Sequence, residues 1–146
     1  MLMGEGMEKT LITRSRNVGD GFFTFNSSTP SEFGDGFMGC DLTVVNTAGP
    51  TKQQAVALHA QSNFAAFRMV NISAYQDTLY THSFHQFYRD CHIYDTIDFI
   101  FDNTAVIFRN CQIFPRKPMP KQQNMITTHG RFEPTQDMSN STLLLS

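Results

Sequence analysis

The stretch Tyr88-Arg-Asp-Cys-His-Ile93 recurs further along the chain as Phe108-Arg-Asn-Cys-Gln-Ile113. The shared pattern is an aromatic residue followed five positions later by Ile or Leu. Two earlier copies are Phe37-Met-Gly-Cys-Asp-Leu42 and Phe67-Arg-Met-Val-Asn-Ile72. The last three copies begin at nearly equal intervals along the chain, and the interval between the first two is longer. Such steps suit one coil of a strand-and-turn solenoid, and the Leu and Asn pattern of leucine-rich repeats is absent. The repeat therefore predicts a right-handed parallel β-helix.

Strand-forming residues dominate the rest of the chain. Runs such as Leu42-Thr-Val-Val45, Phe99-Ile-Phe101 and Val106-Ile-Phe108 are β-branched or aromatic and are bounded by Gly, Asn, Asp or Pro, which is typical of short strands. The 146 residues leave room for one domain, and a 40% share of apolar residues, including 14 Phe, can fill its core. We therefore expect an all-β protein with a single domain over residues 1–146.

Composition and charge disfavour several classes of protein. The chain has 11 Lys and Arg against 13 Asp and Glu, without a run of like charge, so binding to nucleic acid through phosphates is not expected. No stretch approaches the ~18 apolar residues of a membrane span, and residues 1–6 lack the basic and apolar regions of a signal peptide. The three cysteines lack zinc-site spacing, and we expect neither a metal nor an organic cofactor.

The cysteines occupy the fourth position of three copies of the repeat. Cys91 and Cys111 should therefore lie in neighbouring coils, about 4.8 Å apart, and that separation falls within the roughly 4.4 to 6.8 Å that a disulfide accepts. The alternative is a pair of buried free thiols that act as small apolar groups. Geometry alone leaves both alternatives open. Cys40 is expected to stack on Val70 and to stay unpaired.

Counting back from the aromatic residue that opens each copy aligns a row of polar residues. The row consists of Thr24, Gln54, Gln76, Asp77 and Asp98. Asp77 and Asp98 are separated by the length of one coil, so we expect their carboxylates to approach each other across neighbouring strands. Repulsion would raise the pKa of one of them and leave a proton donor beside an ionised nucleophile, while the glutamine amides could stabilise an oxyanion. The alternative is an external polar ladder without chemistry.

Three segments resemble the signature segments of plant pectin methylesterases. They are Gln54-Ala-Val-Ala-Leu58, Tyr75-Gln-Asp-Thr-Leu-Tyr80 and Thr96-Ile-Asp-Phe-Ile-Phe101, and the resemblance extends from Met1-Leu-Met-Gly-Glu-Gly6 to Ile126-Thr-Thr-His-Gly-Arg131. It implies a right-handed parallel β-helix and an enzyme that hydrolyses the methyl esters of galacturonate units in pectin and releases methanol. It also implies a protein secreted to the cell wall.

The resemblance assigns roles to the polar row. Asp98 would be the nucleophile that attacks the ester carbonyl, and Asp77 would protonate the departing methanol and then activate water. Gln54 and Gln76 would stabilise the tetrahedral oxyanion. Substrate binding would involve Thr24, Gln54, Tyr80 and Phe101, although for the two aromatic residues simple packing is the open alternative. The family also pairs cysteines at the positions of Cys91 and Cys111, which favours the disulfide.

The chain departs from the family pattern near the nucleophile. Asp95 and Asp102 stand where the family has glycine, and Thr104 stands where it has alanine. Two added carboxylates should disfavour the ionised form of Asp98 and repel an acidic polymer. An arginine and a tryptophan that the family supplies to its cleft from a later segment do not occur before Ser146, and the family's N-terminal cap and coil are also missing. We therefore expect a β-helix that is incomplete at both ends.

Two rival functions remain open at this stage. The first is a non-enzymatic relative that binds homogalacturonan, which the two added aspartates favour. The second is a β-helical glycosidase that would cleave the sugar backbone with the same acid pair. In either enzymatic case the substrate is a galacturonan. The resemblance adds a proteinaceous pectin methylesterase inhibitor as a partner, and neither nucleic acid nor a membrane is expected to bind.

Overall fold

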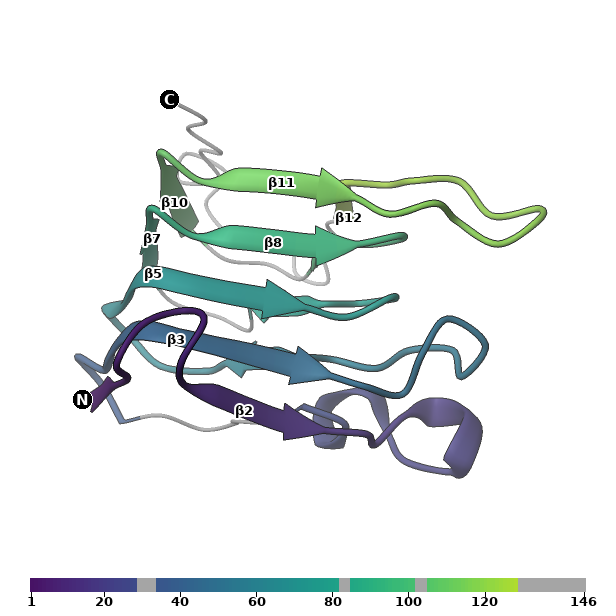
Figure 1. Cartoon of the computed structure of the whole chain (residues 1–146), viewed down its shortest axis with the longest axis horizontal. Coiled ribbons are helices and arrows are strands. Elements are labelled where there is room, and N and C mark those ends of the chain that lie inside the picture. Colours follow the sequence, from purple (N-terminus) through teal and green to yellow (C-terminus); the bar gives the residue numbers. More distant parts are fainter. Residues whose placement is uncertain (29–33, 82–84, 102–104, 129–146) are drawn as a thin grey trace, which may run out of the picture.

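The computed structural model describes residues 1–28, 34–81, 85–101 and 105–128. In these ranges the chain forms parallel strands and two short 3-10 helices (Figure 1). The strands are β1 (Leu2–Met3), β2 (Leu11–Arg14), β3 (Met38–Asn46), β4 (Leu58–Ala60), β5 (Ala65–Ser73), β6 (Leu79–Thr81), β7 (His85–Arg89), β8 (His92–Asp95), β9 (Ile100–Phe101), β10 (Ala105–Arg109), β11 (Gln112–Pro115) and β12 (Thr127–Thr128), and the helices are η1 (Val18–Asp20) and η2 (Thr24–Asn26). Neither helix has the length or the apolar character that a bilayer crossing requires.

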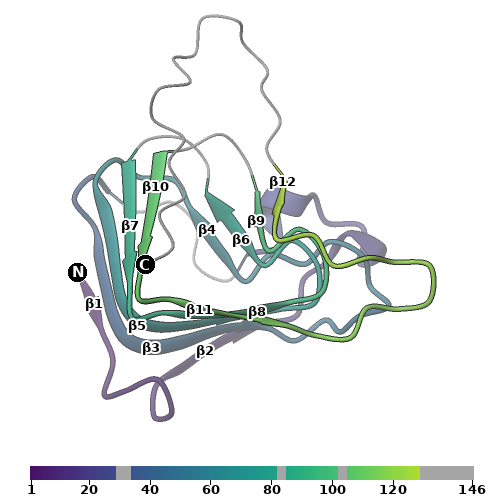
Figure 2. The ribbon, with the colours of Figure 1, turned by 90° about the horizontal axis from the view of Figure 1, so that it is seen from above.

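The strands wind around three walls, which Figure 2 shows along the coil axis. β1, β7 and β10 form the first wall with the beginnings of β3 and β5, and β2, β8 and β11 form the second wall with the ends of β3 and β5. The third wall is the smaller sheet of β4, β6, β9 and β12. All pairs between these strands are parallel, so the predicted parallel β-helix is confirmed.

A left-handed residue marks the bend between the first two walls in each coil. These residues are Asp41, Met69, Asp90 and Asn110, with φ between 51° and 57°. Aspartate and asparagine enter this conformation more readily than other residues with a side chain, because their short polar groups can hydrogen-bond locally. The third residue of the last three copies of the repeat therefore turns the chain from one wall to the next.

The register confirms two of the three predicted steps and corrects the first. Phe67 pairs with Tyr88 and Tyr88 with Phe108, as the nearly equal steps between the last three copies require. However, Phe67 lies opposite Gly39 rather than Phe37. Glycine fits here because a Cβ at position 39 would lie 3.0 Å from the ring of Phe67. The shift also places Cys40 opposite Arg68, so the predicted stacking of Cys40 on Val70 is wrong.

Ladders of equivalent side chains fill the space between the walls. The rings of Phe67, Tyr88 and Phe108 stack with centroids 4.9 Å apart at each step, and all three are buried. The phenol of Tyr88 donates to the side-chain oxygen of Gln86 at 2.8 Å, and the amide of Gln86 donates to the carbonyl of Ala60 at 2.7 Å. The buried phenol of Tyr88 and the buried amide of Gln86 are thereby satisfied, and each buried aromatic side chain contributes about 1.5–3 kcal/mol.

Cys91 and Cys111 are neighbours in successive coils, as predicted. Both are free thiols in the structure, Cys91 fully buried and Cys111 half-buried. A hydrogen bond from the Cys91 thiol lowers the pKa of Cys111 to about 7, and the same bond, together with burial, raises the pKa of Cys91. The disulfide between them stays a prediction.

Candidate active site

Asp77 and Asp98 stack in neighbouring coils, directly before β6 and β9. Gln76 pairs with Ile97 in a parallel bridge, and the amide of Asp77 donates to the carbonyl of Ile97 at 3.1 Å. Both acids adopt the left-handed conformation, with φ of 62° and 54°. The expectation that one coil brings these two acids together is confirmed, although their chemical roles are not tested by this geometry.

Asp77 is largely removed from water, with 8% of its surface exposed. Burial raises the pKa of Asp77 to about 7, with smaller contributions from the charges of Asp98 and Asp95. The raised pKa of one member of the pair was predicted in the right direction, but from charge repulsion alone, whereas desolvation makes the larger contribution. At neutral pH Asp77 retains its proton in a large fraction of molecules.

Asp95 places a third carboxyl group behind the pair. Its side chain is fully buried and accepts hydrogen bonds from the amides of Thr78 at 2.8 Å and Thr96 at 2.6 Å. Burial raises the pKa of Asp95 to about 6, against the opposing effect of the hydrogen bonds from Thr78 and Thr96. Asp95 lies in β8 and is not one of the positive-φ residues, so an aspartate in place of the family's glycine causes no backbone strain at this position. Asp102 and Thr104 lie outside the described residues.

Gln54 and Gln76 belong to the coils that meet at the acids. Gln76 directly precedes Asp77, and its carbonyl accepts a hydrogen bond from Ala55, the neighbour of Gln54. The carbonyl of Gln54 in turn accepts from Val18 at 3.0 Å. Both glutamine side chains are half-buried. The structure therefore places both residues beside the acid pair, and their role as oxyanion donors stays a prediction.

Thr24 opens the helix η2 next to the coil of Gln54. Its carbonyl accepts from the amide of Ser27 at 3.1 Å, and the hydroxyl of Ser27 accepts from the amide of Val56 at 3.0 Å. These bonds fasten the η2 segment to the coil that begins near Gln54. Thr24 is half-buried, and its predicted contact with the sugar is not tested by these bonds.

Tyr80 and Phe101 belong to an aromatic ladder on the third wall. Their rings stack with centroids 4.4 Å apart, and His59 extends the ladder at 4.5 Å from Tyr80. Packing is therefore shown for both predicted aromatic residues, while contact with a pyranose ring stays a prediction. Sequence reasoning missed His59, although it precedes Tyr80 by the same step that separates Tyr80 from Phe101.

The arrangement offers the groups that acyl transfer needs. A carboxyl group that keeps its proton near neutral pH can act as a general acid, and a carboxylate one coil away can act as a nucleophile. Amide side chains flank the pair. In the part of the chain that the structure describes, no cluster of three or more His, Cys, Asp or Glu side chains could hold a metal ion.

Comparison with known proteins places this geometry in a family. The family description "Pectinesterase" matches residues 1–143. The chain belongs to the pectinesterase family. A probable pectinesterase/pectinesterase inhibitor of Arabidopsis thaliana, number 36, is 55% identical over 92% of this chain, and a pectinesterase/pectinesterase inhibitor of Ficus pumila var. awkeotsang is 52% identical over 97%. Each match covers 26% of the relative, so the chain spans about a quarter of these pectinesterases.

Solved pectin methylesterases share the fold. The carrot pectin methylesterase matches with a TM-score of 0.88 and 49% identity, over 92% of this chain and 43% of that one. PemA from Erwinia chrysanthemi matches with a TM-score of 0.74 and 31% identity, over 80% and 40% of the two chains. A pectin methylesterase solved in complex with a hexasaccharide is 28% identical, with a TM-score of 0.81 over 88% and 45% of the two chains. The pectinesterase fold of the described residues is therefore established.

Proposed function

We propose that the chain carries the acid pair of an ester hydrolase that removes methyl groups from homogalacturonan. The observation that carries this proposal is the stacking of Asp77 on Asp98 in a setting that raises the pKa of Asp77 to about 7. Such a pair supplies a proton donor and a nucleophile at the same pH. Membership of the pectinesterase family favours an ester bond over a glycosidic bond as the target.

In the first step the carboxylate of Asp98 attacks the carbonyl carbon of the methyl ester. A tetrahedral intermediate forms, and its negative charge develops on the former carbonyl oxygen. The amide groups of Gln54 and Gln76 donate hydrogen bonds to that oxygen, and neutral donors suit this task because they add no positive charge that must be desolvated beforehand. Removing one donor of this kind typically lowers kcat about 100-fold or more.

In the second step the intermediate collapses and the bond to the methoxy oxygen breaks. Asp77 gives its proton to that oxygen, methanol leaves, and an acyl-enzyme remains on Asp98. The Asp77 carboxylate then takes a proton from a water molecule, which attacks the acyl group. Hydrolysis releases the galacturonate carboxyl group, restores the carboxylate of Asp98 and leaves Asp77 protonated for the next turnover.

The proposed substrate contacts come from two sides of the acid pair. Thr24 and Gln54 lie on the side of the η2 segment, where Ser27 fastens that segment to Val56. Tyr80 and Phe101 lie on the third wall, directly after the acids, where aromatic rings suit the apolar faces of sugars. We assign all four residues to the binding of homogalacturonan in the same proposal.

Location and partner belong to the same proposal. The names of the Arabidopsis and Ficus relatives combine a pectinesterase with a pectinesterase inhibitor. The names support a proteinaceous inhibitor as a partner, and membership of the pectinesterase family supports action in the plant cell wall, outside the cell. An inhibitor that covers the acids would have to contact the third wall, because β6 and β9 follow the two acids.

A binding protein without catalysis is the second candidate, and Asp95 is the observation that favours it. This buried carboxyl group lies close enough to raise the pKa of Asp77. A catalytic acid whose proton is held too firmly would donate it to methanol less readily. Under this alternative the chain would bind homogalacturonan and release no methanol.

Parallel assays of methanol and of reducing ends on highly methylated homogalacturonan test the proposal. We expect the purified chain to release methanol without new reducing ends. The double variant Asp77→Ala/Asp98→Ala, prepared in the same way, controls for contaminating esterases and should release none. Binding of homogalacturonan without release of methanol would show that the chain is a binding protein. New reducing ends without methanol would show that it is a glycosidase.

A further inference from the structure

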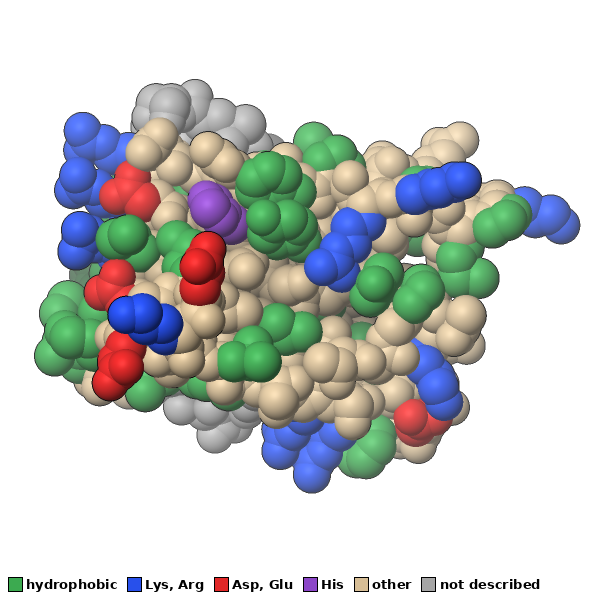
Figure 3. All heavy atoms as spheres, in the orientation of Figure 1, with side chains coloured by type: hydrophobic (Ala, Val, Ile, Leu, Met, Phe, Trp, Pro, Cys, Tyr) green, Lys and Arg blue, Asp and Glu red, His purple; other side chains and the backbone are tan. Residues whose placement is uncertain are grey.

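Arginine side chains form a row along the first wall, away from the acid pair. Arg68, Arg89 and Arg109 pair with one another in register on β5, β7 and β10, and all three are exposed. Neighbouring strands are about 4.8 Å apart, so the row presents one guanidinium group per coil at a short, regular spacing. Figure 3 shows Lys and Arg side chains gathered in a column at the left edge of the molecule, over these strands.

An apolar row runs beside the arginine row. Its members are Met38, Ala66, Phe87 and Ile107, which pair in register two positions before Cys40 and the three arginines. Residues two apart on a strand point to the same face, so both rows lie on the outer surface of the wall. Met38 and Ile107 are 49% and 43% exposed, which leaves the apolar row open to a ligand.

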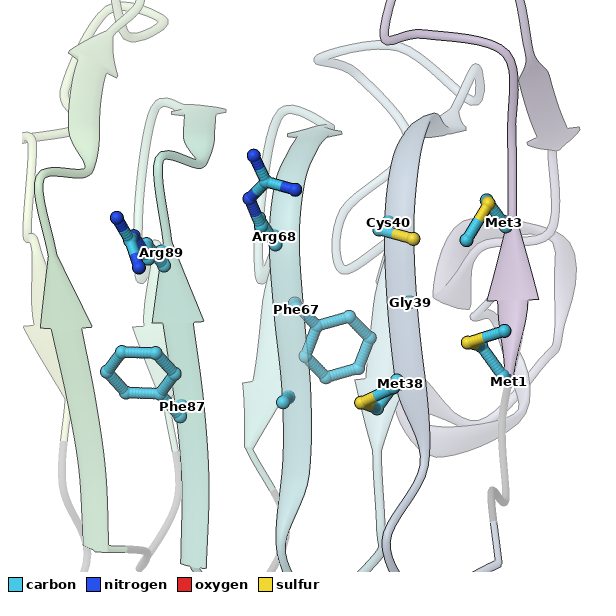
Figure 4. A pocket seen from close by; sticks show the side chains of 10 residues that line it. Met1, Met3, Met38, Gly39, Cys40, Phe67, Arg68, Phe87 and Arg89 are labelled. Atoms are coloured by element: carbon cyan, nitrogen blue, oxygen red, sulfur yellow. The ribbon is translucent and has the colours of Figure 1, made fainter.

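Part of each row lines a groove of about 330 Å³, which includes Arg68, Arg89 and Phe87 but ends before Ile107 and Arg109 on β10. Figure 4 shows Met3, Cys40, Arg68 and Arg89 at one level of this groove and Met1, Met38 and Phe87 at the other. The groove is therefore mostly apolar, with two guanidinium groups at one end of one side, and Arg109 continues that row on β10 outside the groove. A ligand that fits this surface needs an apolar face and negative charges along one edge.

The row keeps an excess of one positive charge, because its three guanidinium groups lie next to a bend that carries two carboxyl groups, Asp41 and Asp90. Asp90 pairs with Arg89 at 3.3 Å, and in the described ranges neither Arg68 nor Arg109 forms an ion pair. Like charges that lie directly opposite each other on neighbouring strands repel, so the row destabilises the free protein slightly. Bound carboxylates would relieve this repulsion, because the guanidinium fork binds carboxylate oxygens in pairs.

We infer that this wall is a second binding surface for demethylesterified homogalacturonan, separate from the acid pair. This inference rests on the proposed function, because homogalacturonan gains one carboxylate for each methyl ester removed. A linear polymer with a carboxylate on every sugar suits a linear row of guanidinium groups, and the apolar faces of the sugars suit Phe87 in the groove and Ile107 beside it. In Figure 2 the wall of β7 and β10 lies across the section from β6 and β9, which follow the acids. The surface would hold the reaction product while the acids act on another stretch of polymer.

Binding of fully demethylesterified polygalacturonate to the whole chain tests the inference. The triple variant Arg68→Gln/Arg89→Gln/Arg109→Gln should bind at least about tenfold more weakly, with a shallower dependence of affinity on salt, because charge-assisted contacts are lost. The triple variant Arg16→Gln/Lys117→Gln/Lys121→Gln removes the same charge from other surfaces and should bind like the parent chain. Circular dichroism of each variant checks that the fold is retained.

Several outcomes would overturn the inference. Equal losses in both triple variants would mean that net charge alone attracts the polymer, and no loss in the arginine variant would mean that the polymer binds elsewhere. Equal competition by poly-glutamate would mean that the wall takes acidic chains in general, including acidic segments of a protein. Phe87→Ala should weaken polygalacturonate binding several-fold if sugars pack on the apolar row, and an unchanged affinity contradicts that contact.

Methanol release separates a failure of this inference from a failure of the proposed function. The arginine variant should still release methanol from short methylated oligosaccharides, because its substitutions lie on another wall. If the parent chain binds polygalacturonate without releasing methanol, and the arginine variant binds it more weakly, the esterase is refuted and the second surface is supported. An active chain whose arginine variant binds normally would refute the second surface and keep the esterase.

Discussion

At two positions in the β-helix, an aspartate with left-handed backbone conformation lies next to the equivalent residue of the following coil. The two pairs differ in whether the aspartate gains a hydrogen bond or a raised pKa. At the bend between the first two walls, Asn110 stacks on Asp90 and donates its amide to the carboxylate at 2.6 Å. At the candidate active site, Asp98 stacks on Asp77, and the pKa of Asp77 rises to about 7. The backbone conformation is the same, since φ lies between 52° and 62° at all four positions.

The difference lies in the partner and in the access of water. At the bend, the amide of Asn110 satisfies the hydrogen-bonding capacity of the Asp90 carboxylate, and water reaches both residues. This pair therefore only stabilises the turn. At the candidate active site, the carboxylate of Asp98 has no hydrogen to donate to the buried Asp77. Its charge instead favours the protonated form of Asp77. One backbone feature of the coil thus serves as a turn in one corner and can hold reactive groups in another.

Asp98→Asn makes the active-site pair resemble the pair at the bend, and it should have the largest effect. We expect methanol release to fall about 1,000-fold or more, because an amide cannot serve as the nucleophile. The pKa of Asp77 should also fall, since the charge of Asp98 is its second cause. Kinetics on methylated homogalacturonan measure the first effect, with Asp90→Asn as the matched control at the bend. Comparable rates for Asp98→Asn and the parent would refute the role of Asp98.

The second prediction concerns the pH dependence of stability. The pKa of Asp77 is about 7 in the folded chain against an ordinary value of 3.8, so the folded state binds more protons between these values. The contribution of Asp77 to stability should therefore be most favourable below about pH 4, decline as pH rises towards 7, and level off above it, by on the order of 4 kcal/mol. Asp77→Asn should remove this contribution, and a smaller decline of the same sign should remain from Asp95, whose folded pKa is about 6.

Denaturant unfolding at several pH values measures this decline. Asp90→Asn is the informative comparison, because it removes a partly exposed acid from the other stacked pair. The decline should persist in Asp90→Asn and shrink in Asp77→Asn. Identical pH dependence in the two variants would contradict the view that burial distinguishes the two places.

The length of one coil could be predicted from the sequence, and with it the residues that become neighbours in successive coils. The nearly equal steps between the last three copies of the repeat determine which residues become neighbours, so the pairing of Asp77 with Asp98 and of Cys91 with Cys111 could be predicted from spacing alone. The first step could not, because Gly39 replaces an aromatic residue in the register and shifts the alignment by two positions. The repeat pattern does not show that Phe67 pairs in register with Gly39, which has no side chain, instead of with Phe37.

Burial was the part that spacing could not predict. The dominant cause of the raised pKa of Asp77 is desolvation, which depends on how much neighbouring coils cover it. Asp95 was treated as one more charge near the nucleophile, whereas its carboxyl group lies inside the coil and holds two backbone amides. The direction in which a side chain points is set by the local backbone, and the repeat alone left it open.

Asp95→Asn should have a smaller effect than the changes in the acid pair itself. The substitution removes a charge that is only the third cause of the raised pKa of Asp77, and it retains one oxygen that can accept from Thr78 or Thr96. Activity that needs protonated Asp77 should therefore decline at a lower pH than in the parent chain. The pH profile of kcat/KM measures the shift, and a purely structural role for Asp95 would lower the rate without moving the profile.

Asn110→Asp makes the bend resemble the active site and should have the smallest effect. The change replaces the amide that donates to Asp90 with a second carboxylate, so the pair loses a hydrogen bond and gains repulsion. Because the bend is partly exposed, solvent screening should limit the loss to under about 1 kcal/mol, and added salt should reduce it further. The double variant Asp90→Asn/Asn110→Asp restores one amide and one acid and should recover most of the loss. A loss of several kcal/mol that salt leaves unchanged would mean that the bend is as closed to water as the acid pair, and burial would then no longer explain why only one stacked pair is reactive.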